Sequence, residues 1–142
     1  MIWAVLIGNT RTVAALMKGT TILKRYIVPT SVLRSPSKSQ VWAEKLSRLS
    51  KVKGVVVASV VPPVDAHVRK AIHQNFELRA LFVNHRTPIG LKVKLKKPAQ
   101  VGADRLANAV AAKELYGHPS IVVDYGTGTT FDVVDRQGDY CG

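Results

Sequence analysis

The sequence predicts an α/β fold built on a mixed sheet, and three observations carry this prediction. Three β-prone segments come first, before any segment with helical periodicity. Helical and β-prone segments then alternate, which is typical of strands joined by crossover helices. The most continuous apolar segment, residues 55–61, lies in this alternating part and is typical of a strand buried on both faces. A chain of 142 residues is also long enough to bury a sizeable core.

Local signals in the first hundred residues predict three antiparallel strands joined by parallel ones. The apolar first strand stops at Gly8, and Lys18-Gly19 predicts a hairpin turn. Ser39 is the expected N-cap of the first helix, and Pro62-Pro63 ends the apolar strand and opens the second helix. Strands are expected at residues 2–7, 12–17, 21–28, 54–61 and 78–83, and helices at residues 39–50 and 64–75.

The last forty residues predict one helix followed by a hairpin. Residues 103–116 have a helix-forming composition, and Gly117 is a natural stop. Strands are expected at residues 120–125 and 131–135, on either side of a turn rich in glycine and threonine, with a last turn at residues 136–139. Residues 84–101 contain prolines, a glycine and four lysines, and are expected to form a loop.

The charge is strongly positive and unevenly distributed. The formal net charge is +12, with 18 Lys and Arg against 3 Asp and Glu in residues 1–100, and 3 against 6 in residues 101–142. Such a surface attracts polyanions, so nucleic acid is one possible partner. The other interpretation is a lysine-rich surface that is simply solvated.

No apolar run is long enough to span a bilayer. A single cysteine, Cys141, and the lack of a signal peptide indicate a cytoplasmic location.

An internal echo relates the two ends of the chain at an offset of 118 residues, placing Gly8 over Gly126. Each copy is a strand, a turn rich in Gly, Thr and Asn, and a second strand. Such turns present backbone N–H groups and hydroxyls to a phosphate, although a plain β-hairpin would need the same glycines. Asp124 ends an otherwise apolar strand, and a carboxylate there is costly to bury unless it meets a cation or donors.

A third group of residues, Gly102-Ala103-Asp104-Arg105, opens the predicted helix at residue 103. Asp104 falls in the first turn, where the helix dipole favours a carboxylate. One interpretation is a helix cap or a surface Asp–Arg pair. The other is a base that accepts a hydroxyl proton during phosphoryl transfer, with Arg105 holding an anionic group of the substrate.

These motifs together resemble type III pantothenate kinase, of the acetate and sugar kinase, Hsp70 and actin superfamily. The resemblance rests on GNTRT at residues 8–12, ASVVPPV at 58–64, VGADRLANAVAAKELYG at 101–117 and IVVDYGTGTTFDVVD at 121–135. It implies ribonuclease H-like (actin-like ATPase) domains and ATP-dependent phosphorylation of pantothenate in coenzyme A synthesis. It also implies a cytosolic homodimer. The expected domains are residues 1–100, an interdomain helix at 101–117, and the start of a second domain at 118–142.

The resemblance also implies the roles of individual residues. Gly8, Asn9, Thr10, Arg11 and Thr12 would form the first ATP phosphate loop, with Gly126 and Thr127 in the second. Gly102, Ala103, Asp104 and Arg105 would bind pantothenate, with Asp104 as the catalytic proton acceptor. Asp124 would bind the monovalent cation (K⁺ or NH₄⁺), and Mg²⁺ would accompany ATP.

Departures from the family pattern predict impaired turnover. Leu6 occupies the slot of a family aspartate, and leucine cannot orient magnesium or its waters. Because the first strand is expected to be buried, an aspartate at residue 6 is expected to cost a few kcal/mol without ligand. Leu95 occupies the slot of a tyrosine that lines the pantothenate pocket. The chain also stops just inside the second expected domain, so part of the ATP site and of the dimer interface would be missing. The alternative function is a non-catalytic polyanion- or nucleic-acid-binding module on the same fold.

Overall fold

The computed structural model describes residues 1–126 and 128–142. The chain divides into two compact units, Met1–Phe82 and Val83–Gly142. The domain boundaries expected from the sequence, at residues 100 and 117, stay predictions. Within the described part of the chain, no helix is long and apolar enough to cross a membrane.

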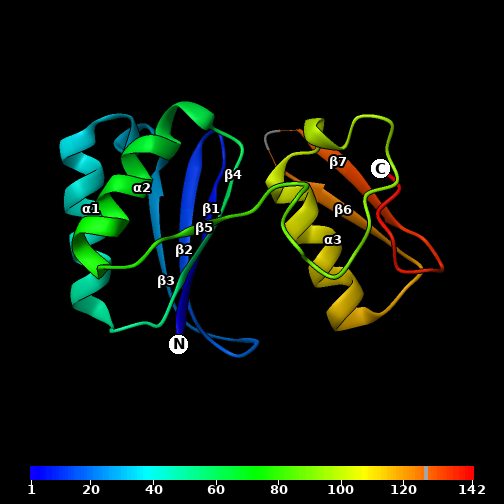
Figure 1. Cartoon of the computed structure of the whole chain (residues 1–142), viewed down its shortest axis with the longest axis horizontal. Helices are drawn as coiled ribbons and strands as arrows, with labels where there is room; N and C mark the ends of the chain where they lie inside the picture. The colour runs from blue at the N-terminus through cyan, green and yellow to red at the C-terminus, as the bar shows by residue number, and fades with distance from the viewer. Residues whose placement is uncertain (127) are drawn as a thin grey trace. The chain divides into compact units, whose positions relative to one another are not determined.

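The first unit is a five-stranded mixed sheet with two α-helices packed on one face (Figure 1). Its strand order is β3-β2-β1-β4-β5, with β1–β2 and β2–β3 antiparallel and β1–β4 and β4–β5 parallel. The elements are β1 (Ile2–Ile7), β2 (Arg11–Lys18), β3 (Thr21–Pro29), the 3₁₀ helix η1 (Thr30–Arg34), α1 (Pro36–Leu49), β4 (Val55–Ser59), α2 (Pro62–Phe76) and β5 (Leu81–Phe82). The predicted α/β class, the antiparallel meander and the internal position of β4 are confirmed.

The core of the first unit follows from the alternation of side chains along its strands. Trp3, Val5 and Ile7 of β1 are buried, and they form one cluster with apolar residues of β2, β4, α1 and α2. The intervening residues of β1 point to the opposite face, since successive side chains of a strand alternate. Leu6 is one of these, and 42% of its surface is exposed. The expectation that residue 6 is buried is therefore wrong, because only every second residue of β1 faces the helices.

Several boundaries differ from those expected, and capping explains one of them. α1 begins at Pro36 instead of Ser39, because Ser35 is the N-cap and its Oγ accepts a hydrogen bond from Lys38 N at 3.4 Å. A proline is favoured in the first helical turn. Ser39 is instead buried and donates to the carbonyl oxygen of Leu33 at 3.0 Å. β5 has two residues instead of six.

The second unit places one helix against a β-hairpin. It contains the 3₁₀ helix η2 (Pro98–Gln100), α3 (Ala103–Tyr116), β6 (Ser120–Tyr125) and β7 (Thr129–Val134). α3 and β6 have the predicted bounds, and Gly117 ends the helix with a φ of 86°. One face of the hairpin packs on α3, where Ala109, Val134 and Tyr140 are completely buried. The other face exposes the apolar side chains of Ile121, Val123, Tyr125, Phe131 and Val133.

The two hairpins of the internal echo, β1–β2 and β6–β7, are both antiparallel but differ in loop length. The last paired residues are Ile7 and Thr12 in the first hairpin, and Tyr125 and Thr129 in the second. The offset of 118 residues therefore holds for the strand before each turn, and it becomes 117 after the turn. Leu6 and Asp124 still occupy equivalent positions, two residues before each glycine.

Candidate active site

The Gly102–Arg105 motif lies at the N-terminus of α3, as predicted. Gly102 is the N-cap, and its carbonyl accepts the first helical hydrogen bond from Leu106 N at 3.2 Å. Ala103 is buried beneath the first turn, and Asp104 is partly exposed. Asp104 Oδ1 accepts a hydrogen bond from Arg105 N at 2.7 Å. No second hydrogen bond to the Asp104 carboxylate is present within residues 1–126 and 128–142, so it keeps acceptor capacity near the positive end of the helix.

Arg105 is held against strand β7 by three groups. Its Nε donates to Asp132 Oδ1 at 2.6 Å, and its Nη2 donates to the carbonyl oxygen of Phe131 at 2.7 Å. Its guanidinium carbon lies 5.9 Å from the centre of the Tyr140 ring. The Arg105 side chain remains 33% exposed. The motif arginine is therefore paired with an internal aspartate instead of with its neighbour Asp104.

Asp132 and Tyr140 are polar residues that the sequence reasoning missed. Asp132 is completely buried, and the Tyr140 hydroxyl donates to its Oδ1 at 2.9 Å. Burial first, and then this hydrogen bond, raises the pKa of Tyr140 to about 12. A signal for Asp132 was present, because strand alternation places it on the same side of β7 as the buried Val134. No comparable signal marks Tyr140, which follows the last predicted turn.

Asp124 meets an amide donor from α3. Asn108 Nδ2 donates to Asp124 Oδ2 at 3.2 Å. Asn108 lies four residues after Asp104, and this spacing places both side chains on one face of the helix. The structure thus brings Asp124, predicted to bind a cation, to the same helix that carries the Gly102–Arg105 motif. Asn108 was also missed, although the spacing from Asp104 could have indicated it.

The turn at residues 8–12, predicted to bind phosphate, is a tight turn in the first unit. Gly8 N donates to the carbonyl oxygen of Arg11 at 3.0 Å, and a Cβ on Gly8 would approach that same oxygen to 3.1 Å. Asn9, Thr10 and Arg11 are exposed. Thr12 is buried, and its Oγ1 lies 3.0 Å from Thr30 Oγ1, whose hydroxyl also donates to Gly8 O at 2.6 Å. The Thr12 hydroxyl therefore supports the turn from inside the unit, whereas Asn9 and Arg11 lie at its surface.

The second loop keeps a close backbone contact as well. Gly126 N donates to the carbonyl oxygen of Gly128 at 3.1 Å. A Cβ on Gly126 would lie 3.6 Å from that oxygen, an ordinary contact, and one on Gly128 would meet nothing within 4 Å. Thr127, predicted to contact ATP, lies outside the described residues.

A network of charges joins the lysine-rich loop to the last turn. Lys94 Nζ lies 2.7 Å from Asp135 Oδ2 and 3.1 Å from Asp139 Oδ2. These contacts with Lys94 lower the pKa of both aspartates and raise the pKa of Lys94. Leu95, in the slot of the family tyrosine, packs against the buried cluster around Tyr140. At least one of the four lysines of this loop therefore has a structural partner.

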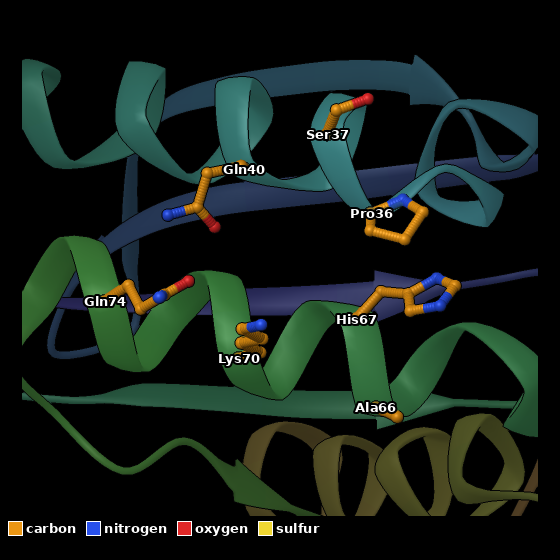
Figure 2. A pocket seen from close by; sticks show the side chains of 7 residues that line it. All are labelled: Pro36, Ser37, Gln40, Ala66, His67, Lys70 and Gln74. Atoms are coloured by element: carbon orange, nitrogen blue, oxygen red, sulfur yellow. The ribbon is translucent and has the colours of Figure 1, made fainter.

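A surface pocket of about 500 Å³ lies between α1 and α2 (Figure 2). Its lining combines Lys70 and His67 of α2 with Pro36 and Gln40 of α1. The His67 ring nitrogen Nδ1 lies 3.2 Å from the carbonyl oxygen of Leu33. The pocket contains no carboxylate, and none of the residues predicted for ATP or pantothenate lines it.

The described residues contain no cluster of three or more His, Cys, Asp or Glu side chains that could hold a metal ion. Mg²⁺ that accompanies a nucleotide is usually held by one or two carboxylates together with phosphates and water. At the first loop Leu6 contributes no oxygen ligand, so that loop does not fit a magnesium site. At the second loop the Asp124 carboxylate is a suitable oxygen donor for a cation.

Comparison with known proteins agrees with the motifs. The sequence model of the family "Type III pantothenate kinase" matches residues 2–142. Curated relatives called type III pantothenate kinase include one from Thermomicrobium roseum, 41% identical over 147 residues, and one from Rhodospirillum rubrum, 38% identical over 148 residues. Both alignments cover 100% of this chain but 57% and 58% of the relatives. A third relative, from Koribacter versatilis, is 47% identical over 91 residues, which are 64% of this chain and 33% of that protein. The chain spans little more than half the length of the first two relatives, and it belongs to the type III pantothenate kinase family.

Proposed function

We propose that this chain contributes to an ATP-dependent kinase that phosphorylates pantothenate to 4'-phosphopantothenate, the reaction that opens coenzyme A synthesis. The observation that carries the proposal is the Asp104 carboxylate in the first turn of α3, inside the motif that the family resemblance assigns to pantothenate. The relatives' shared name supports the same substrate. The α/β fold, with its five-stranded mixed sheet, is the ribonuclease H-like arrangement of this family.

In this proposal Asp104 accepts the proton of the pantothenate hydroxyl. As the proton moves to the carboxylate, the hydroxyl oxygen forms a bond to the γ-phosphorus of ATP, and the bond to the ADP oxygen breaks. The acceptor capacity that Asp104 retains supports this role. Arg105 presents a partly exposed guanidinium from the same turn and would bind the pantothenate carboxylate, since a planar guanidinium matches a carboxylate in shape and charge.

The nucleotide and cation sites are proposed from the two hairpin turns. Gly8 to Thr12 and Gly126 with Thr127 would contact the phosphates of ATP, whose charge Mg²⁺ would neutralise. Asp124, oriented by Asn108, would bind the monovalent cation K⁺ or NH₄⁺. Leu6 offers no ligand on the first side, so we expect weak coupling of magnesium to nucleotide binding. The homodimer and the cytoplasmic location remain predictions.

The test is an assay of the 142-residue chain with ATP, Mg²⁺, K⁺ and pantothenate, reading 4'-phosphopantothenate by mass spectrometry. We expect slow turnover that Asp104→Asn lowers by about 10²- to 10⁴-fold, because a general base contributes about that much. Glu114→Gln is the matched control: it removes one negative charge from an exposed position of the same helix and should change nothing. Equal rates for Asp104→Asn and Glu114→Gln would contradict the proposed role of Asp104.

The alternative, a non-catalytic module that binds nucleic acid, receives no support from the comparisons. Its physical basis is the net charge of +12, together with the leucine at residue 6. In the lysine-rich loop, moreover, Lys94 is already paired with Asp135 and Asp139.

A further inference from the structure

Asp132 is a buried carboxylate at a position where an apolar residue would be expected. It lies in β7 beside completely buried residues, and none of its surface is exposed. Its Oδ2 has no hydrogen-bond partner within residues 1–126 and 128–142, so only Oδ1 is satisfied. Burying a charge costs several kcal/mol, and a pair held by few hydrogen bonds is often less stable than an apolar replacement. Stability alone therefore gives no reason for an aspartate here.

The contacts of Asp132 converge on the orientation of Arg105. Nε and Nη2 form one edge of the guanidinium, and this edge faces Asp132 Oδ1 and the Phe131 carbonyl at 2.6 and 2.7 Å. The other edge is formed by Nη1 and Nη2, and Nη1 donates no hydrogen bond to the described part of the chain. A guanidinium held by one edge presents the other as a pair of parallel donors.

Tyr140 holds the carboxylate in turn. Its hydroxyl donates to the same Oδ1 at 2.9 Å, and its ring is completely buried against Ala109 and Val134. Tyr140 is also tied to the loop at Lys92 and Lys94, because its N donates to Lys92 O and its O accepts from Lys94 N, both at 2.8 Å. The buried ring and the backbone hydrogen bonds hold the Tyr140 hydroxyl in place, and this hydroxyl in turn holds the Asp132 carboxylate.

We propose that Asp132, held by Tyr140, is a positioning residue that orients Arg105 so that its free edge can bind the carboxylate of pantothenate. The inference rests on the proposed function, and it adds two residues to the motif at the start of α3. Asp132 does not touch the substrate. It restricts the rotamers of a long, flexible side chain before the ligand arrives, which lowers the entropy lost on binding.

Two ligands separate positioning from other roles. Pantothenate carries the carboxylate, whereas pantothenol, its alcohol analogue, does not. Binding of both to the 142-residue chain is measured by calorimetry for wild type, Asp132→Asn, Tyr140→Phe and Glu114→Gln. We expect Asp132→Asn to weaken pantothenate about tenfold and Tyr140→Phe less, with pantothenol affinity unchanged, because a lost charge-assisted hydrogen bond is worth about a factor of ten or more. Glu114→Gln should alter neither ligand.

The opposite results have distinct meanings. Removing a negative charge near Arg105 should by itself tighten binding of an anion, so equal or tighter pantothenate binding by Asp132→Asn overturns the inference. Equal losses for both ligands mean a purely structural role and overturn it as well. If the wild type binds neither ligand, the proposed function fails, and with it the role of Asp132 in substrate binding.

A second measurement does not depend on the ligand. The Arg105 Nε–H signal in ¹⁵N NMR, identified by its loss in Arg105→Lys, should exchange slowly with water in the wild type. We expect fast exchange in Asp132→Asn and an intermediate rate in Tyr140→Phe, which keeps the ring and is the milder substitution for the fold. An unchanged Nε–H signal in both variants would show that Asp132 does not hold Arg105, whatever the ligand results are.

Discussion

The two glycine hairpins share one pattern but differ at the residue two positions before the glycine. In the first hairpin this residue is Leu6, which pairs with Val13 and Ala58 in the sheet and is 42% exposed. In the second it is Asp124, which accepts a hydrogen bond from Asn108 of α3. The first hairpin belongs to a five-stranded sheet, whereas the second has only two strands. The two turns therefore differ in side-chain chemistry although both join an antiparallel strand pair: the first has an apolar residue where the second has a carboxylate.

The two units also differ in how they treat buried polar groups. The buried polar side chains near the first turn are the hydroxyls of Thr12 and Thr30, which bond to each other. The second unit buries the charged Asp132 and pairs it with Arg105. A buried hydroxyl costs little when it is paired, whereas a buried charge depends entirely on its partner. Loss of one partner should therefore affect the second unit much more strongly.

The largest expected effect is the loss of Arg105. Arg105→Met leaves Asp132 buried without a cation, and breaking such a pair costs about 3–5 kcal/mol. Hydrogen exchange followed by mass spectrometry should show loss of protection in β6 and β7 and no change in β1 and β2. Arg48→Met is the control, because it removes an exposed ion pair with Glu44 in the other unit and should cost about 0.5 kcal/mol or less. Equal effects of the two substitutions would contradict the difference between the units.

The second prediction concerns alkaline pH. The pKa of Tyr140 is raised to about 12 in the folded chain, above the ordinary value of 10. Between these two values the unfolded state loses a proton that the folded state keeps, so stability is present below pH 10 and is lost as the pH rises towards 12. The loss amounts to about 3 kcal/mol at most. Urea unfolding of the second unit from pH 9 to 12 should show this slope, and Tyr140→Phe should flatten it. If the free energy of unfolding of Tyr140→Phe falls equally steeply with pH, the effect comes from the titration of lysines and not from Tyr140.

Much of the architecture could be predicted from the sequence because it depends on local patterns. The apolar strand, predicted at residues 54–61 and observed as β4 at Val55–Ser59, follows from composition, and the helix at 103–116 follows from composition and from Gly117. Helix α1 was expected to begin at Ser39, because two serines compete as caps and only the folded chain shows that Ser35 makes the hydrogen bond. The short β5 also differs, since pairing with β4 limits it to two residues.

The site could be predicted only in part, for a related reason. Asp104 and Asp124 stand in recognisable motifs, so the sequence alone identifies them as candidates. Strand alternation indicates that Asp132 is buried, but it does not indicate the partner. Asp132 and Tyr140 contact Arg105, which lies 27 and 35 residues earlier in the sequence, and no local pattern predicts these contacts. The exposure of Leu6 was also misjudged, because an apolar strand does not reveal which of its faces meets the helices.

The third prediction compares the glycines of the two turns. A Cβ on Gly8 would press on the Arg11 carbonyl at 3.1 Å, and that oxygen is already held by the Gly8 N–H. A Cβ on Gly128 would meet nothing within 4 Å. Gly8→Ala should therefore destabilise the first unit by about 1–2 kcal/mol, a cost typical of overpacking, and Gly128→Ala should cost less. Urea unfolding monitored by Trp3 and Trp42 fluorescence reports on the first unit, and hydrogen exchange reports on the second. A larger effect at Gly128 would contradict the difference in turn geometry.

The smallest effect on stability is expected where the two hairpins differ most in chemistry. Leu6→Asp makes the first hairpin resemble the second. Because Leu6 is 42% exposed, a carboxylate there stays in contact with water, and the substitution should cost about 1 kcal/mol, mainly through lost apolar burial and the low strand propensity of aspartate. Leu6→Asn is the matched control of nearly the same size. Urea unfolding of both variants gives this cost directly.

Leu6→Asp is expected to lower stability but to raise the affinity for Mg²⁺-ATP. A carboxylate two residues before Gly8 can orient the waters of a magnesium ion beside the phosphates, which neither leucine nor an uncharged amide does as well. Calorimetric titration with ATP should therefore show tighter binding by Leu6→Asp only when Mg²⁺ is present, with little gain for Leu6→Asn. A core position would lose stability on this change and gain no ligand affinity. If Leu6→Asp binds Mg²⁺-ATP no better than the wild type, position 6 takes no part in nucleotide binding in this chain. The difference between Leu6 and Asp124 would then be explained by the packing of each sheet and not by phosphate binding. Membership of the family rests on the whole sequence and would not be affected.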